Sequence, residues 1–191
     1  MKKKISLIIV GSALLALGAY MAQVSQFGSD PLSYLWVGMA IRFNITMGQA
    51  NLISAFIMLI IAYLYDKSFL HVGTILSPLV ITVVFDLMGL TQFVPKTTIS
   101  RIVVFLSGLI IYAYGLALYL KQDYGKSPYD GLITSGMGMF KKSYGTIKTC
   151  LDAGLYITSI LLGAPIVIGP FIFVLLSGML IQWFLLSKLV V

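Results

Sequence analysis

The sequence has few charged residues for its length. Only 10% of its 191 residues are charged, whereas charged residues make up about 25% of an ordinary soluble domain. Hydrophobic residues make up 59%. This composition excludes a typical soluble globular protein and predicts an integral membrane protein, with the lipid bilayer as its main surroundings.

Cysteine and histidine are nearly missing. Cys150 lies in an apolar run, where we expect it to be buried, and one cysteine allows neither an intramolecular disulfide nor a cysteine metal cluster. His71 is the one histidine, and no two carboxylates stand close together in the sequence. Acid–base or nucleophilic chemistry therefore lacks an obvious set of residues. We expect no enzymatic activity, no bound metal and no cofactor.

Basic residues outnumber acidic ones, 13 to 6, but they lie at the ends of apolar runs. They form no basic face interleaved with aromatic side chains, so we expect no nucleic-acid partner. The run 135–138 also lacks the strand before it and the Lys-Ser/Thr after it that a phosphate loop requires. The basic residues are better read as topology signals.

The sequence repeats itself at an offset of 97 positions. The matched pairs are Gly11 and Gly108, Ala16 and Ala113, Gly18 and Gly115, Phe27 and Tyr124, Gly28 and Gly125, Pro31 and Pro128, Leu35 and Leu132, and Gly48 and Gly145. With one further gap, Gly73 matches Gly169. We therefore expect one membrane domain over residues 1–191, built from repeat 1 (5–90) and repeat 2 (102–187).

The apolar runs predict an all-α bundle of membrane helices. Six runs approach the roughly 20 residues that a membrane span requires: 5–24, 47–65, 72–90, 102–120, 144–163 and 165–186. Although the basic start followed by an apolar run imitates a signal peptide, the first run matches the internal run 102–120, so we expect a membrane helix rather than a leader.

Each repeat also holds a shorter run, 31–43 and 128–140. Thirteen helical residues extend only about 20 Å, too short for a hydrocarbon core of about 30 Å. Asp30 before Pro31 and Ser127 before Pro128 are typical helix starts, an N-cap oxygen followed by proline. We predict two half-helices that enter the membrane without crossing it, although interfacial turns would explain the same Pro and Gly residues.

Lysine and arginine counts place both termini in the cytoplasm, because basic residues favour that side. The count is ten inside and three outside whether the half-helices cross, giving eight spans and parallel repeats, or do not cross, giving six spans and inverted repeats. Length favours six. Lys126, next to Ser127, counts against deep insertion because a lysine near the bilayer centre is costly.

Two facing half-helix starts would provide a binding site for an anionic or strongly polar group, because the first N–H groups of a helix lack partners within it. Charged residues inside membrane helices usually face a bundle interior or a wet path. The predicted substrate-binding residues are Asp30, Pro31, Ser127, Pro128, Asp130, Lys148 and Asp152. Plain alternatives stay open, since the aspartates could simply cap helices and Lys148 and Asp152, four residues apart, could simply neutralise each other.

Small and aromatic residues have simpler interpretations. Small faces that let helices approach closely or dock a partner are formed by Ser12 with Ala16, Gly18 with Ala22, and Gly136 with Gly138 and nearby Ser135. Asp86 would reach the headgroups. Tyrosines near helix ends are typical of an interfacial belt; they are Tyr63, Tyr65, Tyr112, Tyr114 and Tyr119.

The segments 27–32 and 124–132, with Gly145 and Thr146 after them, resemble the YczE/YitT-like group of bacterial integral membrane proteins. The resemblance covers most of the chain. It implies a bacterial cytoplasmic-membrane protein of about this size, and it supplies neither a substrate nor catalytic residues.

The repeated broken helix favours a small transporter or channel for a polar or anionic small solute, with its site between the half-helix starts. The alternative is a membrane-embedded interaction or regulatory subunit whose small-residue faces bind a helix-packing partner or a second copy of the chain.

Overall fold

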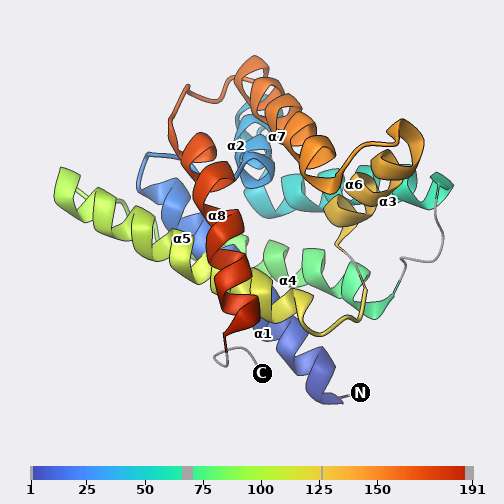
Figure 1. The fold of residues 1–191 in the computed structure, drawn as a ribbon. Coiled ribbons are helices and arrows are strands. Elements are labelled where there is room, and N and C mark those ends of the chain that lie inside the picture. The colour runs from blue at the N-terminus through green and yellow to red at the C-terminus, as the bar shows by residue number, and fades with distance from the viewer. Residues whose placement is uncertain (1, 66–70, 126, 188–191) are drawn as a thin grey trace.

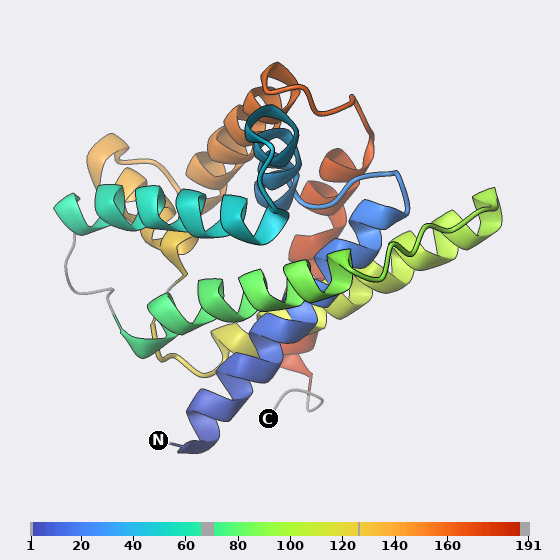
Figure 2. The same ribbon diagram turned by 180° about the vertical axis from the view of Figure 1, so that it is seen from behind.

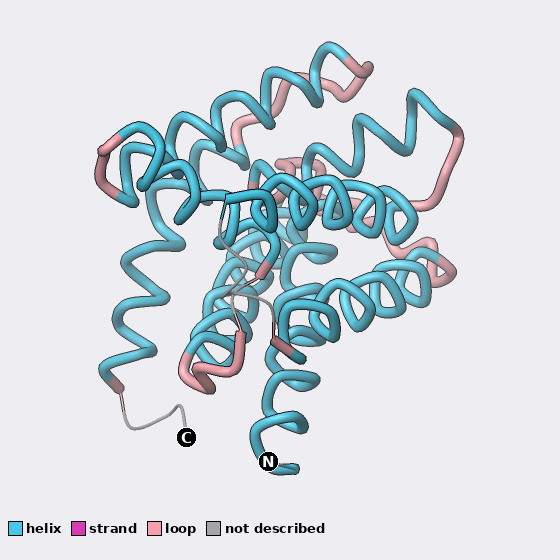
Figure 3. The backbone as a smooth tube through the Cα atoms, turned by 90° about the vertical axis from the view of Figure 1, so that its right-hand side faces the viewer, coloured by secondary structure: helices cyan, strands magenta, loops and turns pink. Residues whose placement is uncertain are grey.

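The computed structural model describes residues 2–65, 71–125 and 127–187. These residues fold into helices joined by short loops, without a strand among them (Figures 1 and 3). The helices are α1 (Lys2–Val24), α2 (Pro31–Phe43), α3 (Met47–Tyr65), α4 (Val72–Gly89), α5 (Thr98–Leu120), α6 (Pro128–Phe140), α7 (Tyr144–Leu161) and α8 (Gly169–Leu186). The all-α prediction is confirmed for the described part of the chain.

The two short helices have the predicted bounds because local signals fix both of their ends. At α2, Asp30 adopts an extended conformation and its side chain accepts a hydrogen bond from the Ser33 N–H group. At α6, Ser127 does the same for the N–H group of Asp130. Each helix then stops at a left-handed residue, Asn44 or Lys141, a conformation that ends a helix.

Helices α1 and α5 cross at the centre of the molecule, where glycines bring the two backbones together (Figure 1). A Cβ atom at Gly11 would meet the Gly115 carbonyl at 2.9 Å, and one at Gly18 would meet the Gly108 carbonyl at 2.5 Å. Because the facing residue number falls on α5 as it rises on α1, the two helices run antiparallel.

The remaining helices extend this crossing into two groups. Helix α4 packs on α1 and α8 packs on α5, while in the other group α2 packs on α7 and α3 packs on α6. Helices α3 and α4 lie side by side and join the two groups, as Figure 2 shows in cyan and green. Each short helix thus packs against a long helix from the other half of the sequence.

The loops before the short helices have matching conformations. Gly28 and Gly125 both have positive φ, 90° and 113°, a region that glycine enters without steric cost. The Gly169 N–H group donates to the Phe27 carbonyl oxygen at 2.7 Å, and the Gly73 N–H group donates to the Tyr124 carbonyl oxygen at 3.1 Å. Each loop is therefore fixed to the start of a helix in the other half.

Five of the described helices are long and apolar enough to cross a membrane: α1, α3, α4, α5 and α8. The sequence predicted six spans. The predicted run 144–163 corresponds to α7, which has 18 residues but carries Lys148 and Asp152 and is not among the five. Length and composition therefore give five spans, and the predicted count of six needs an additional reason.

Candidate functional site

A cavity of about 330 Å³ lies between the two helix groups. Every described helix contributes to its lining, from Leu15 on α1 to Gln182 on α8. The seven predicted site residues all line it: Asp30, Pro31, Ser127, Pro128, Asp130, Lys148 and Asp152. The fold therefore brings the starts of α2 and α6 and the charged face of α7 to one cavity.

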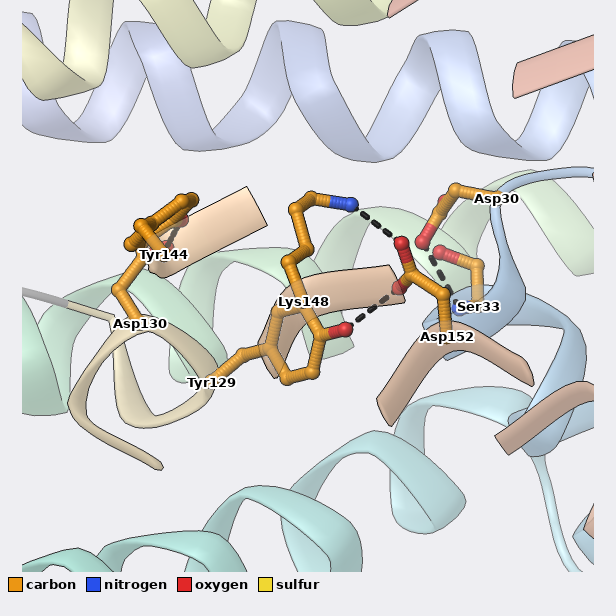
Figure 4. Close-up of polar contacts among 7 residues, drawn as sticks. All are labelled: Asp30, Ser33, Tyr129, Asp130, Tyr144, Lys148 and Asp152. Carbon is orange, nitrogen blue, oxygen red and sulfur yellow. Dashed lines mark hydrogen bonds and ion pairs between the residues drawn. The ribbon is translucent and has the colours of Figure 1, made fainter. Parts of the chain in front are cut away.

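Asp152 is the centre of one polar cluster on this cavity (Figure 4). The Lys148 ammonium donates to Asp152 Oδ2 at 2.5 Å, and the Tyr129 hydroxyl donates to Asp152 Oδ1 at 2.5 Å. The Asp152 side chain is 5% exposed and the Lys148 side chain is 38% exposed. Both carboxylate oxygens are therefore satisfied, and the predicted pairing of these two residues is present.

Asp130 is similarly satisfied by its neighbours. Its Oδ2 accepts from the Ser127 hydroxyl at 2.8 Å, and its Oδ1 accepts from the Tyr144 hydroxyl at 2.7 Å. Tyr144 is the first residue of α7, so Asp130 joins α6 to α7. Asp130 was predicted either to support the start of its helix or to bind a substrate. These hydrogen bonds correspond to the first interpretation.

Asp30 differs from the other two aspartates of the cavity. Its Oδ2 accepts from the Ser33 N–H group at 3.1 Å, but its buried Oδ1 has no hydrogen-bond partner among the described residues. The whole residue is only 8% exposed. Its carboxyl group lies beside that of Asp152 in Figure 4. Asp30 thus brings an unpartnered carboxylate oxygen to the cavity.

The N–H groups at the half-helix starts are largely used by the protein itself. Ser33 donates to the Asp30 side chain and Tyr34 donates to the Asp30 carbonyl oxygen. In α6, Asp130 and Gly131 donate to the side chain and the carbonyl oxygen of Ser127. Fewer free donors are therefore left for an anion than the sequence suggested.

The sequence missed Tyr129 and Tyr144 as partners of the cavity carboxylates, because these hydrogen bonds join residues 23 and 14 positions apart. The belt interpretation was wrong for two other tyrosines. Tyr119 is 3% exposed and donates to the Gly125 carbonyl oxygen, and Tyr112 lines the cavity against Phe173. Aromatic position along a helix alone does not show which side faces the interior.

Other candidates have structural roles or lie elsewhere. Asp86 accepts a hydrogen bond from the Gly48 N–H group at 3.1 Å, in the first turn of α3. Cys150 is exposed, which corrects the prediction that it is buried, because it occupies an outer face of α7. Lys126 lies outside the described residues. No group of three or more metal-ligating His, Cys, Asp or Glu residues occurs in the described ranges.

The small-residue faces of α1 pack against other helices of the same protein. Ser12, Ala16 and Ala22 are fully buried, and a Cβ atom at Gly18 would meet backbone atoms of α5. The Ser12 hydroxyl donates to the Ser77 hydroxyl on α4 at 2.9 Å. These faces therefore serve the α1–α5 and α1–α4 contacts, and their use for docking an external partner loses its basis.

Comparison with known proteins identifies a family but does not assign it an activity. The sequence profile of a family described as "Family of unknown function (DUF6198)" matches residues 2–185. An uncharacterized protein of Haemophilus influenzae is 30% identical over 184 residues, covering 96% of this chain and 84% of that protein.

Two Bacillus subtilis proteins are also similar. The uncharacterized protein YyaS is 28% identical over 183 residues, covering 92% of this chain and 89% of its own length. The uncharacterized membrane protein YczE is 22% identical over 178 residues, covering 91% and 81%. No solved structure matches the chain. The predicted resemblance to a YczE-like group of membrane proteins is confirmed.

Proposed function

The chain belongs to the DUF6198 family, and we propose that it is a small bacterial membrane transporter or channel that moves a small polar solute through the central cavity. The observation that carries this proposal is the convergence of both half-helix starts on one cavity lined by every described helix. Transporters of this type bind their solutes where interrupted helices from two repeats meet.

Inverted repeats are part of the proposal, and three structural pairings support them. Helices α1 and α5, which would be equivalent, cross antiparallel. The contact of α2 with α7 corresponds to that of α6 with α3. The hydrogen bond from Gly169 to Phe27 corresponds to the one from Gly73 to Tyr124. A pseudo-two-fold relation between residues 5–90 and 102–187 would produce all three.

We assign the sixth span to α7. Its polar residues Lys148 and Asp152 line the cavity, so they lower its mean hydropathy without facing lipid. Three spans in each repeat reverse the direction of the second repeat, which agrees with the antiparallel α1 and α5. Four spans in each would make these helices parallel. In this proposal α2 and α6 enter the membrane without crossing, and both termini lie in the cytoplasm.

A membrane-embedded interaction or regulatory subunit was the alternative, and a specific observation weighs against it. The small-residue face of α1 that would dock a partner is buried against α5. An enzyme is also not part of the proposal, because the cavity carboxylates Asp130 and Asp152 are held by hydrogen bonds within the protein.

Access to the cavity from both faces of the membrane tests the proposal. Replacing the single cysteine by Cys150→Ser gives a background for introducing Ser177→Cys, a cavity position on α8, and Leu175→Cys, a control on α8 that is 71% exposed and does not line the cavity. Both variants are treated with a membrane-impermeant methanethiosulfonate reagent in right-side-out and inside-out vesicles.

A transport pathway predicts that the S177C thiol reacts from both faces and that the L175C thiol, in lipid, reacts from neither. Reaction of S177C from one face only, or from neither, would refute a pathway through this cavity. Flux in proteoliposomes containing only this protein would then separate a transporter from an accessory subunit, because a subunit would be inactive alone.

A further inference from the structure

The charges of the cavity indicate the class of solute. Three aspartates and one lysine of the described residues line it: Asp30, Asp130, Asp152 and Lys148. Lys148 pairs with Asp152, and Asp130 accepts hydrogen bonds from two hydroxyl groups. Asp30 therefore lacks a dedicated cationic partner within the described part of the chain.

The Asp30 Oδ1 atom, which has no partner among the described residues, could accept a hydrogen bond from a ligand. A buried carboxylate oxygen without a hydrogen bond costs free energy that a paired one does not. The same carboxylate already accepts from Ser33 through Oδ2, so its orientation is fixed before any ligand binds. A donor that enters the cavity would satisfy Oδ1 and add an attractive charge interaction.

The walls of the cavity suit an apolar body attached to such a donor. Trp36, Tyr112 and Phe173 line it together with many aliphatic side chains. Aromatic faces attract cations, and more strongly when water is excluded. A volume of about 330 Å³ lies at the lower end of ligand pockets, which span about 300–1,000 Å³. The cavity fits a compact organic molecule.

We infer that the cavity binds a small organic ammonium ion, with the Asp30 carboxylate as its counter-ion. This inference rests on the proposed transport function and names its substrate class. It differs from the anionic solute that the helix starts suggested, because the Ser33 and Asp130 N–H groups at those starts already donate to the side chains of Asp30 and Ser127.

Three probes of similar size test the assignment. Benzylamine and benzyl alcohol share a benzyl group and differ in a cationic or neutral head group, and benzoate carries an anionic carboxylate on the same phenyl ring. Binding of each to the purified full-length protein is measured by isothermal titration calorimetry and by the shift of the thermal unfolding midpoint. We expect benzylamine to bind at least about tenfold more tightly than benzyl alcohol, because one hydrogen bond to a charged group changes the affinity by about this factor. We expect benzoate to bind most weakly.

The Asp30→Asn variant removes the charge but keeps an N-cap side chain of the same size, since asparagine caps as well as aspartate. We expect it to weaken benzylamine binding by about tenfold to hundredfold and benzyl alcohol binding by less than twofold. Asp123→Asn is the matched control, because Asp123 is exposed in a loop and does not line the cavity. If D30N does not fold, Asp30→Ser offers a second neutral cap.

The outcomes separate this inference from the proposed function. Equal binding of the three probes, preference for benzoate, or unchanged benzylamine binding in D30N would overturn the ammonium assignment, even where S177C reacts from both membrane faces. Benzylamine binding that depends on Asp30 would support the assignment even if S177C reacts from one face only, a result that would overturn transport alone.

Discussion

At the residue scale, the cavity contains two kinds of carboxylate. Asp152 and Asp130 each accept two side-chain hydrogen bonds, so they join helices α6 and α7. Asp30 holds the start of α2 with one oxygen and leaves the other without a partner in the described chain. The same residue type thus joins helices at two positions, and at the third it provides the oxygen that we propose binds a ligand.

The Lys148–Asp152 pair gives a prediction at this scale. Asp152→Asn should lower the free energy of unfolding by about 1–3 kcal/mol, because a buried acceptor of charged and neutral hydrogen bonds loses its charge. A double-mutant cycle with Lys148→Met should give a coupling of only about 1 kcal/mol, because Lys148 is 38% exposed and partly screened. Unfolding in mixed micelles measures both values.

Asp123→Asn, in an exposed loop, controls for the amide substitution itself and should leave the free energy of unfolding unchanged. A D152N protein as stable as the wild type would show that Asp152 does not hold α6 against α7.

At the element scale, the α1–α5 crossing depends on the absence of side chains at its glycines. A Cβ atom at Gly18 would lie 2.3 Å from the Tyr112 backbone nitrogen and 2.5 Å from the Gly108 carbonyl oxygen. Backbone atoms cannot rotate away as a flexible side chain can. The glycines that match in the two halves of the sequence therefore lie at the contact between α1 and α5.

We predict that Gly18→Ala lowers the free energy of unfolding by about 1–3 kcal/mol, since the added methyl group must push two backbones apart. Gly154→Ala is the same substitution within α7, where a Cβ atom meets nothing within 4 Å. Because alanine favours the helix by about 0.5–1 kcal/mol over glycine, G154A should be as stable as the wild type or more so. Equal effects of the two substitutions would contradict the close crossing.

At the scale of the whole molecule, the number of spans decides how the two halves of the sequence, which we propose are repeats, are oriented in the membrane. With six spans, Phe43 at the end of α2 and Lys142 after α6 lie on opposite sides of the membrane. With eight spans, both lie in the cytoplasm. Both residues are exposed, so either site accepts a cysteine.

In the Cys150→Ser background, we predict that Phe43→Cys reacts with an impermeant maleimide added to intact cells and that Lys142→Cys reacts only after the membrane is opened. Labelling is read by the mass shift of the purified protein. Protection of both cysteines in intact cells would indicate eight spans and remove the inverted arrangement.

The sequence predicted the local features of this protein. It predicted the bounds of α2 and α6 and their caps at Asp30 and Ser127, because a cap, a proline and a terminating residue act on neighbouring backbone groups. It also selected seven residues that line one cavity. It missed Tyr129 and Tyr144, and it misplaced Tyr112 and Tyr119, because their partners lie on other helices or loops.

The sequence by itself determined that the chain is a helical membrane protein with two short helices at 31–43 and 128–140, since mean composition, run length and capping are local properties. Only the tertiary structure decided that α1 and α5 cross antiparallel, that the small faces of α1 are used internally, and that one Asp30 carboxylate oxygen has no partner among the described residues. These features depend on which side chains from distant segments meet in three dimensions. Their meeting decides which charged side chains line the cavity.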